Sequence, residues 1–307
     1  MEFLETKLDG TIGTIVIDHL EKRNALSRQL VDGLVETLQN FEQKNVRAVV
    51  LRARPGVKVW SSGHDVDELP EGGRDPLGWD DPLRYLVRAV EECSAPIIAL
   101  IEGGVWGGAC EVVFACDLII AAPNASFAVT PARLGVPYNV TGMLTFLNAC
   151  PLRILKEMAF TARPVSAERA ERLGIINHVI DLERLDSFAY SVASDIAQNA
   201  PLSISVMKEQ LRMLAGAHPM SPRRFERVQG LRRIVYTVRI MRKASAPSRK
   251  SASQGFRGDS LAQGANPFGV PPRLIVATVD TDSGEILSLR ADSWPVLVES
   301  GGRDGSL

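Results

Sequence analysis

The stretch Val105-Trp106-Gly107-Gly108-Ala109-Cys110-Glu111 follows an apolar, β-rich run, Pro96 to Glu102, and leads into a segment with helical character. Two adjacent glycines at such a junction let the backbone approach a ligand closely, because no Cβ atom intervenes. The first turn of a helix also carries unpaired N–H groups and a partial positive charge. Such a turn stabilises an oxyanion when a second N–H donor points at the same position. The alternative is a glycine pair that only packs beneath a helix.

A second loop, Trp60-Ser61-Ser62-Gly63-His64-Asp65, favours the functional interpretation. It follows another predicted strand, Arg47 to Ala53, which is rich in valine and alanine. Two Gly-containing loops that each follow a buried strand are the arrangement that two convergent backbone donors require.

Composition limits the classes of protein to which the chain can belong. The 307 residues are 45% hydrophobic and 23% charged, with a formal net charge of −1. This is ample for a soluble globular core, and it gives no basic field that would attract nucleic acid or an anionic membrane. No apolar run reaches the roughly 18–20 residues that span a bilayer, and the acidic N-terminus lacks a signal-peptide core. Four cysteines without metal or redox spacing fit a reduced, cytoplasmic protein.

Strand and helix patterns alternate through the first two-thirds of the chain. The strands expected are Thr11 to Asp18, Arg47 to Ala53, Pro96 to Ile101, Asp117 to Ala121 and Ser126 to Val129. Between and after them, apolar residues at helical spacing predict helices, and the last third is helical. The Gly-, Pro- and Asp-rich residues 70–82 predict a loop that covers part of the molecule. The pattern indicates an α/β core with a helical C-terminal part.

Several ordered motifs resemble the enoyl-CoA hydratase/isomerase (crotonase) family. They are Lys22 to Leu26, Ser61 to Asp65, Gly107 to Glu111, Cys116 to Ala121, Leu134 to Pro137 and Ala170 to Gly174. The resemblance covers about Phe3 to Tyr236. It implies a crotonase-type spiral of ββα turns, homotrimers or dimers of trimers, and acyl-CoA thioester substrates.

The resemblance also implies a site. The two backbone N–H donors of the family's oxyanion hole fall on His64 and Gly108, and one of its two catalytic glutamates falls on Glu111. Six further positions are expected to contact the substrate. They are Lys22, Ser61, Ser62, Gly63, Gly107 and Pro131.

One departure from the family pattern bears on the reaction. The second family glutamate would fall near Pro131, where the chain has no carboxylate. Adding water to a C=C bond needs a base for the water and an acid for the carbon. Simple hydration is therefore disfavoured.

Further strings resemble the members of the family that decarboxylate malonyl-type thioesters. They include Glu68 to Pro70, Gly72 to Leu77, Asp80 to Arg84 and Thr130 to Asn139. This resemblance implies that the chain is a lyase that decarboxylates methylmalonyl-CoA, or a close malonyl thioester, to the propionyl-CoA product through an enolate. It adds Tyr138 as the group that holds the substrate carboxylate. No cofactor is implied beyond the coenzyme A of the substrate, and no nucleic acid or membrane partner. The alternatives are another crotonase-family hydratase, isomerase or hydrolase, or a non-catalytic acyl-CoA-binding protein.

Each of these residues also has a structural alternative. The His64 side chain need not act, because the proposed donor is its backbone. Tyr138 alone would more often be a packed aromatic residue in a turn, and Glu111 a carboxylate favoured at a helix start. We expect Asp65 to be structural. Core packing is the better prediction for the tryptophans Trp60, Trp79 and Trp106.

After Tyr236 the chain changes character, because residues 237–258 are basic and serine-rich without an apolar face. Permitted codons for this stretch, read one base out of register, give an acidic amphipathic helix and a Lys/Arg-Pro ending of the kind the family has. We therefore predict a spiral core at 1–200, a truncated helical oligomerisation part at 201–236 and an aberrant, frameshifted and disordered tail at 237–307. A genuine extension, with a hairpin within Leu274 to Ser288, is the alternative.

Overall fold

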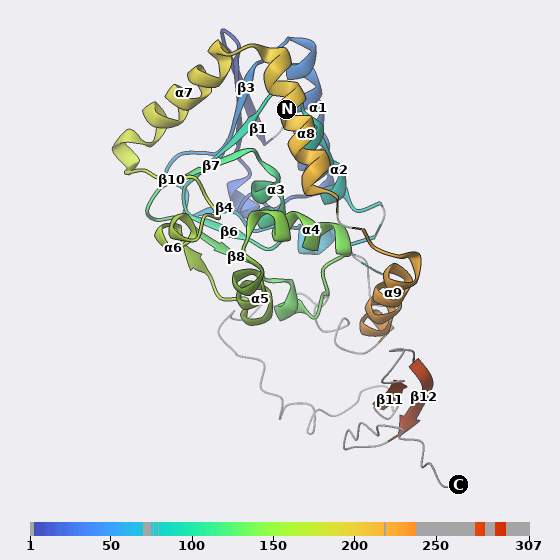
Figure 1. Cartoon of the computed structure of the whole chain (residues 1–307). Coiled ribbons are helices and arrows are strands. Elements are labelled where there is room, and N and C mark those ends of the chain that lie inside the picture. Colours follow the sequence, from blue (N-terminus) through green and yellow to red (C-terminus); the bar gives the residue numbers. More distant parts are fainter. Residues whose placement is uncertain are drawn as a thin grey trace, which may run out of the picture. The chain divides into compact units, whose positions relative to one another are not determined.

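The computed structural model describes residues 3–69, 75, 77–78, 80–217 and 219–237, and the backbone of 274–279 and 286–292. The chain divides into two compact units, Met1–Lys250 and Ser251–Leu307. All elements up to α9 belong to the first unit, and β11 and β12 belong to the second (Figure 1).

The first unit contains a six-stranded main sheet in the order β1-β2-β3-β5-β7-β10. Its strands are β1 (Leu4–Asp9), β2 (Ile12–Ile17), β3 (Ala48–Ala53), β5 (Ile97–Ile101), β7 (Leu118–Ala121) and β10 (His178–Val179). β1 and β2 form an antiparallel pair, and the other neighbours are parallel. β3 and β5 are buried along their whole length, as their apolar sequences predict.

The first unit also contains a four-stranded small sheet, with strands in the order β4-β6-β8-β9. Its strands are β4 (Val59–Ser61), β6 (Gly104–Trp106), β8 (Ser126–Ala128) and β9 (Val165–Ser166). β4, β6 and β8 run parallel to one another, and β9 pairs with β8 in the antiparallel direction.

The two sheets are built by repetition of one unit. Each of β3, β5 and β7 is followed by one short strand of the small sheet, and a helix then returns the chain. This repetition is the expected spiral of ββα turns. The loop at Ser62 and the glycine pair at Gly107 therefore come directly after β4 and β6, and not after the long strands from which we predicted them. Strands of three residues show too few alternations for a pattern to reveal them.

Nine α-helices and three short 3₁₀ helices are found in the described residues. The α-helices are α1 (Arg28–Gln43), α2 (Pro82–Glu92), α3 (Gly108–Ala115), α4 (Val140–Ala149), α5 (Leu152–Thr161), α6 (Ala167–Arg172), α7 (Leu182–Gln198), α8 (Pro201–Ala215) and α9 (Pro222–Thr237). The 3₁₀ helices are η1 (Leu20–Lys22), η2 (Val66–Glu68) and η3 (Pro131–Leu134). Side chains cap several starts: Ser27 accepts from Leu30 N in α1, and Asn139 from Gly142 N in α4.

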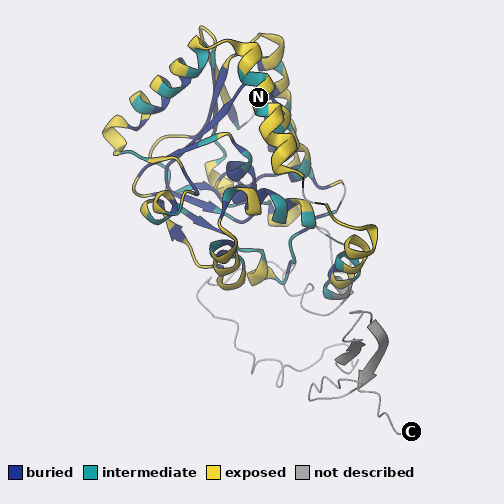
Figure 2. Ribbon diagram, viewed as in Figure 1, coloured by how far each residue is buried: buried dark blue, intermediate teal, exposed yellow. Residues whose placement is uncertain are grey.

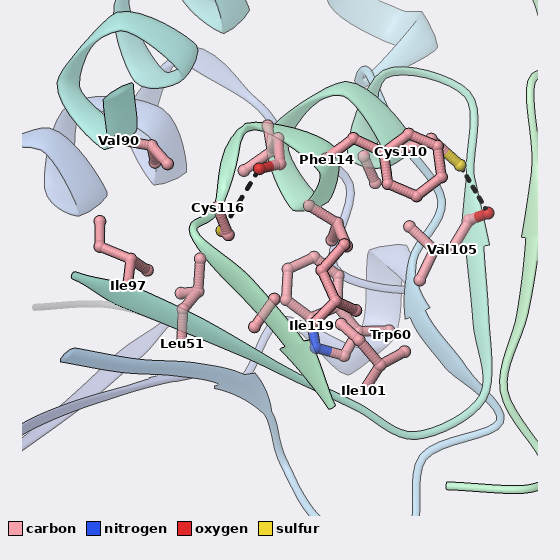
Figure 3. Packing of buried hydrophobic residues seen from close by; sticks show 14 of the residues in the cluster. Leu51, Trp60, Val90, Ile97, Ile101, Val105, Cys110, Phe114, Cys116 and Ile119 are labelled. Carbon is pink, nitrogen blue, oxygen red and sulfur yellow. Dashed lines mark hydrogen bonds between the residues drawn. The ribbon is translucent and has the colours of Figure 1, made fainter. Parts of the chain in front are cut away.

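Both faces of the main sheet are covered by apolar side chains. One cluster joins Ala48, Val50 and Ile98 of the sheet to the buried face of α7. The larger cluster lies on the other face and contains Leu51, Ile97 and Trp60 (Figure 3). The Trp60 indole donates to Leu100 O at 3.0 Å, which confirms that Trp60 belongs to the core.

The four cysteines are buried free thiols. In Figure 3, Cys110 donates to Val105 O at 3.2 Å and Cys116 to Val112 O at 3.4 Å. Burial raises the pKa of both thiols, so neither is a reactive thiolate near neutral pH.

The helical C-terminal part contains an exposed helix. All residues of α8 are described, and none is buried (Figure 2). Lys208 anchors α8 by donating to Val90 O at 3.2 Å, to Ala95 O at 3.3 Å and to Asp117 Oδ2 at 2.8 Å. None of the described helices is both long and apolar enough to cross a bilayer.

In the second unit, β11 (Leu274–Val279) and β12 (Ile286–Asp292) form an antiparallel pair. This pairing matches the hairpin that we considered as the alternative to a disordered tail. Residues 282–284, where we considered the turn of that hairpin, and most of the segment from 238 onward lie outside the described residues.

Candidate functional site

Three segments with predicted functional residues follow the carboxyl ends of the parallel strands of the small sheet. Ser62 to His64 follow β4, Gly107 follows β6, and Thr130 and Pro131 come shortly after β8. Because β4, β6 and β8 are neighbours that run in one direction, these segments meet at one edge of the sheet. Ligands bind at this edge in many sheets with parallel strands.

Two glycines in these loops have backbone conformations that other residues rarely adopt. Gly63 has φ +89° and Gly107 has φ +55°, both in the left-handed region. A Cβ atom on Gly63 would lie 2.6 Å from Trp106 O and 3.0 Å from Gly108 N. The two loops therefore touch through their main chains, with no space for a side chain between them.

The backbone amides of His64 and Gly108 differ from those of their neighbours in the chain. Among the described residues, neither N–H has a hydrogen-bond acceptor, although the amides of Asp65 and Gly107, next to them in the chain, are bonded to Leu26 O and Ala128 O. Gly108 is the first residue of α3, where N–H groups lack intrahelical acceptors. A Cβ atom on Gly108 would lie 3.6 Å from His64 N, so the two amides are close neighbours.

His64 and Gly108 both line one cavity, which we call the inner cavity. It has a volume of about 60 Å³. Its lining consists of Ser62, His64, Val66, Leu69, Leu77, Gly107, Gly108, Thr130, Pro131, Leu134, Val136 and Tyr138. A wider outer cavity of about 500 Å³ shares His64 and Leu69 with it. An oxyanion in the inner cavity could accept from both amides at once.

The first turn of α2 braces both donor residues. His64 Nε2 lies 3.2 and 3.3 Å from the two carboxylate oxygens of Asp81, whose side chain also caps α2 by accepting from Leu83 N. The Leu83 side chain packs on the other donor, because a Cβ atom on Gly108 would lie 2.8 Å from Leu83 Cδ2. Asp81 therefore holds the His64 residue, and Leu83 supports Gly108.

Replacing Asp81 by serine is expected to lower kcat about tenfold, the equivalent of roughly 1.4 kcal/mol, which is within the range for one lost hydrogen bond. Serine still caps the helix but is too short to reach the imidazole. Steady-state kinetics and a thermal melt would check the effect. Asp80→Ser, at the exposed neighbouring position, serves as the control. Equal kcat in the two variants would contradict a role for Asp81.

Tyr138 and Glu111 are neighbouring side chains beside the amides. Glu111 lies one turn after Gly108 in α3, is 4% exposed, and lies next to the Tyr138 hydroxyl. Gly142 of α4 packs closely on both, since a Cβ atom there would lie 2.7 Å from the Tyr138 ring and 2.9 Å from Glu111 Oε1. The Tyr138 ring also packs edge-on against the Phe146 ring, with the two ring centroids 5.0 Å apart.

The pair has shifted proton affinities. Burial raises the pKa of Glu111 to about 7, and the nearby Tyr138 hydroxyl partly opposes this rise. Burial and then the nearby Glu111 carboxylate raise the pKa of Tyr138 well above its usual value. At neutral pH, Tyr138 is thus a neutral donor and Glu111 is partly protonated.

The raised pKa of Glu111 predicts a loss of stability with increasing pH. Folding favours the protonated acid, so this contribution is complete below the usual pKa of 4.5 and is lost as pH rises through about 7. The loss amounts to about 3 kcal/mol. Urea unfolding at pH 5 and pH 8 should show Glu111→Gln gaining relative to wild type at the higher pH. An identical pH dependence of the two proteins would contradict the shift.

Of the six residues predicted to contact substrate, three line the inner cavity and three are not among its lining residues. Ser62, Gly107 and Pro131 line the inner cavity, and Gly63 lies between two lining residues. Ser61 is fully buried and donates to Asn24 O at 2.7 Å. Their contacts with a substrate remain predictions.

Lys22 is engaged by carboxylates. It donates to Asp65 Oδ2 at 2.7 Å and to Asp67 Oδ2 at 3.1 Å, and these bonds raise its pKa. Asp65 is buried and caps η2, which is a structural role as expected. Lys22 is absent from the lining of the inner cavity as described. Trp79 lies outside the described residues.

Sequence reasoning missed most of the apolar lining and the brace at Asp81. Thr130 approaches Gly107, where a Cβ atom would lie 3.0 Å from Thr130 Oγ1. Its place just after a predicted strand was the one available signal. Leu77 comes from the segment that we expected to be a surface cover, yet it is 5% exposed and packs with Val136.

A family model described as enoyl-CoA hydratase/isomerase matches residues 7–229. The chain belongs to this family. The crotonase fold is also that of its structural neighbours.

Two curated members of the enoyl-CoA hydratase/isomerase family illustrate its range. The chain is 46% identical to methylmalonyl-CoA decarboxylase of Escherichia coli K12 over 225 residues, which cover 73% of the chain and 86% of the relative. It is 31% identical to carnitinyl-CoA dehydratase of Salmonella paratyphi A over 211 residues, 69% of the chain and 80% of the relative.

Solved structures agree with the first of these similarities. Methylmalonyl-CoA decarboxylase in complex with 2-nitronate-propionyl-CoA superposes with a TM-score of 0.78 at 43% identity, covering 79% of this chain and 94% of that one. The complex with 2S-carboxypropyl CoA gives a TM-score of 0.78 at 42% identity, covering 80% and 94%.

Proposed function

We propose that the protein is a carboxy-lyase that converts methylmalonyl-CoA, or a close malonyl thioester, to propionyl-CoA and CO2. The observation that carries the proposal is a pair of amides, His64 N and Gly108 N, that have no acceptor among the described residues and belong to residues lining one small cavity with Tyr138. The 46% identity to methylmalonyl-CoA decarboxylase supports the same reaction.

The reaction breaks the bond between the α-carbon and the carboxylate. Its electron pair moves toward the thioester, CO2 leaves, and negative charge collects on the thioester oxygen of the enolate. The two amides form the oxyanion hole for that oxygen. One such donor contributes about 3–4 kcal/mol to stabilising the transition state.

Tyr138 holds the substrate carboxylate perpendicular to the thioester plane, so that the breaking bond overlaps the π system. The raised pKa of Tyr138 keeps its hydroxyl protonated at neutral pH. A neutral donor suits this role, because a cation would stabilise the carboxylate in the ground state and oppose its departure.

Glu111 supplies or orients the proton that the enolate takes up at the α-carbon. With a pKa of about 7, it is protonated in a substantial fraction of molecules near neutral pH. The reaction consumes this one proton and no oxidant or metal, so we propose no cofactor beyond the coenzyme A of the substrate.

Two features disfavour hydration as the main activity. The second family glutamate would fall near Pro131, which lines the inner cavity and carries no carboxylate, and Glu111 lies beside Tyr138. Hydration needs a separate acid and base, and none of the described residues that line the inner cavity supplies a second carboxylate beside Glu111. The inner cavity, about 60 Å³, also favours a short branched acyl group over a long chain.

We further propose that the protein acts in the cytoplasm as a homotrimer or dimer of trimers. Exposed apolar side chains on α8, among them Leu202, Leu211 and Leu214, support an interface there. Near-neutral net charge supports a small-molecule substrate in place of nucleic acid.

Incubation with methylmalonyl-CoA and, separately, crotonyl-CoA tests the proposal. Release of CO2 and propionyl-CoA from the first is expected. Formation of 3-hydroxybutyryl-CoA from the second, with no decarboxylation, would establish a hydratase instead. Tight binding of both thioesters without turnover would indicate an acyl-CoA-binding protein.

A further inference from the structure

Leu77 forms an apolar wall of the inner cavity. It is 5% exposed and packs with Val136 and Tyr138, both of which line the same cavity. Its side chain thus lies beside the hydroxyl-bearing ring assigned to the substrate carboxylate. The size of this side chain limits the space available to an acyl group at that point.

The backbone of Leu77 is held from both sides by side chains. Asp75 Oδ1 accepts from Leu77 N at 2.9 Å, and Leu77 O accepts from Asn139 Nδ2 at 3.4 Å. Asn139 is also the cap of α4 and follows Tyr138 in the chain. The position of Leu77 relative to Tyr138 is therefore fixed by hydrogen bonds as well as by packing.

Asp75 is in turn held by α9. Arg232 is buried and donates to the same Asp75 Oδ1 at 2.8 Å. The Arg232 side chain is only 6% exposed. Because it is buried, its ion pair with Asp75 is screened much less by salt than a pair at the surface. Asp75 Oδ1 thus links Arg232 of α9 to Leu77 in the wall of the inner cavity.

We propose that Leu77 determines which α-substituent the site accepts, and that Arg232 is a positioning residue that sets Leu77 through Asp75. This inference rests on the proposed function. In wild type, the Leu77 side chain leaves space for a methyl branch and excludes an ethyl branch. Loss of the Leu77 side chain, or of its anchor, relaxes the exclusion.

The test compares kcat/KM for ethylmalonyl-CoA with kcat/KM for methylmalonyl-CoA. Discrimination of a single methylene in an apolar pocket is typically about 10- to 200-fold. We expect Leu77→Ala to raise the ethyl-to-methyl ratio at least about tenfold. Because a ratio cancels the fraction of folded enzyme, a general loss of stability does not change it.

Leu38→Ala is the matched control for Leu77→Ala. Leu38 is also 5% exposed but lies in α1, in the core. It should lose stability and keep the wild-type ratio. If Leu77→Ala fails to fold, Leu77→Val gives a smaller shift in the same direction. An unchanged ratio in a folded Leu77 variant overturns the assignment.

Arg232→Gln should raise the ratio by a smaller factor, and Arg232→Lys should restore it in part. In the Leu77→Ala background, Arg232→Gln should not change the ethyl-to-methyl ratio further, because the Leu77 side chain that Arg232 positions is absent. Arg233→Gln, with a side chain 70% exposed, is the control. Independent, additive shifts would overturn the connection through Asp75.

Binding separates this inference from the proposed function. Calorimetry with propionyl-CoA and butyryl-CoA measures the same selectivity without turnover. A shift in relative affinity in Leu77→Ala, with no decarboxylation by wild type, supports the role of Leu77 and overturns the lyase assignment. Decarboxylation with unchanged selectivity in both assays overturns the role of Leu77 alone.

Discussion

Gly63→Ala is expected to lower kcat for decarboxylation by about 100- to 1,000-fold, the loss typical for one oxyanion donor. The new Cβ atom would lie 2.6 Å from Trp106 O and 3.0 Å from Gly108 N. Main-chain atoms cannot rotate away, so the two loops must separate. The gap between the His64 and Gly108 amides then no longer matches one oxygen atom.

Backbone strain alone must be separated from this effect. Gly56 has φ +79°, close to the +89° of Gly63, but a Cβ atom on it meets nothing within 4 Å. Gly56→Ala therefore carries a similar conformational cost without the collision. Single-turnover kinetics on both variants should show normal chemistry in Gly56→Ala. Equal losses in the two variants would mean that the convergence of the loops is unimportant.

Tyr138→Phe is expected to lower kcat by about 10- to 150-fold, because a hydrogen bond to a charged group contributes roughly 1.5–3 kcal/mol. The ring and its packing on Phe146 remain, so only the hydroxyl is removed. The variant also deprives Glu111 of the hydroxyl that lowers its pKa. The pKa of Glu111 should therefore rise, and the pH profile of kcat should move upward with it.

Tyr190→Phe is the matched control, since it removes a tyrosine hydroxyl that bonds Thr14 Oγ1 at 2.9 Å, away from the inner cavity. Its kcat and pH profile should equal those of wild type. A Tyr138→Phe enzyme with full activity would show that another group orients the substrate carboxylate. Thr130 would then be the first residue to mutate.

Local pattern predicted much of the architecture. Apolar residues at helical spacing between the first two predicted strands indicated a helix where α1 lies, and the apolar runs predicted β3 and β5. The α/β class followed from the alternation of strand and helix patterns, and the family resemblance followed from ordered motifs. What local pattern did not reveal were the three-residue strands β4 and β6, whose pairing comes from tertiary contact and not from their own propensity.

The candidate site was predictable where it depends on backbone and not where it depends on packing. Gly-containing loops after apolar strands indicated two convergent segments, and the family resemblance indicated His64 and Gly108 within them. In contrast, nothing near Asp81 in the sequence indicates that it reaches His64, 17 positions away. The same holds for Leu77, which a Gly- and Pro-rich neighbourhood made look like surface loop.

The proposed donors, the backbone amides of His64 and Gly108, also determine which substitutions can test them. Both donors belong to peptide units, so a scan that trims every side chain to alanine leaves the N–H of residue 64 in place. His64→Ala would report the loss of the Asp81 contact and remain silent about the donor itself. Reading the donor directly calls for an ester in place of the peptide link, introduced by semisynthesis or by an α-hydroxy acid.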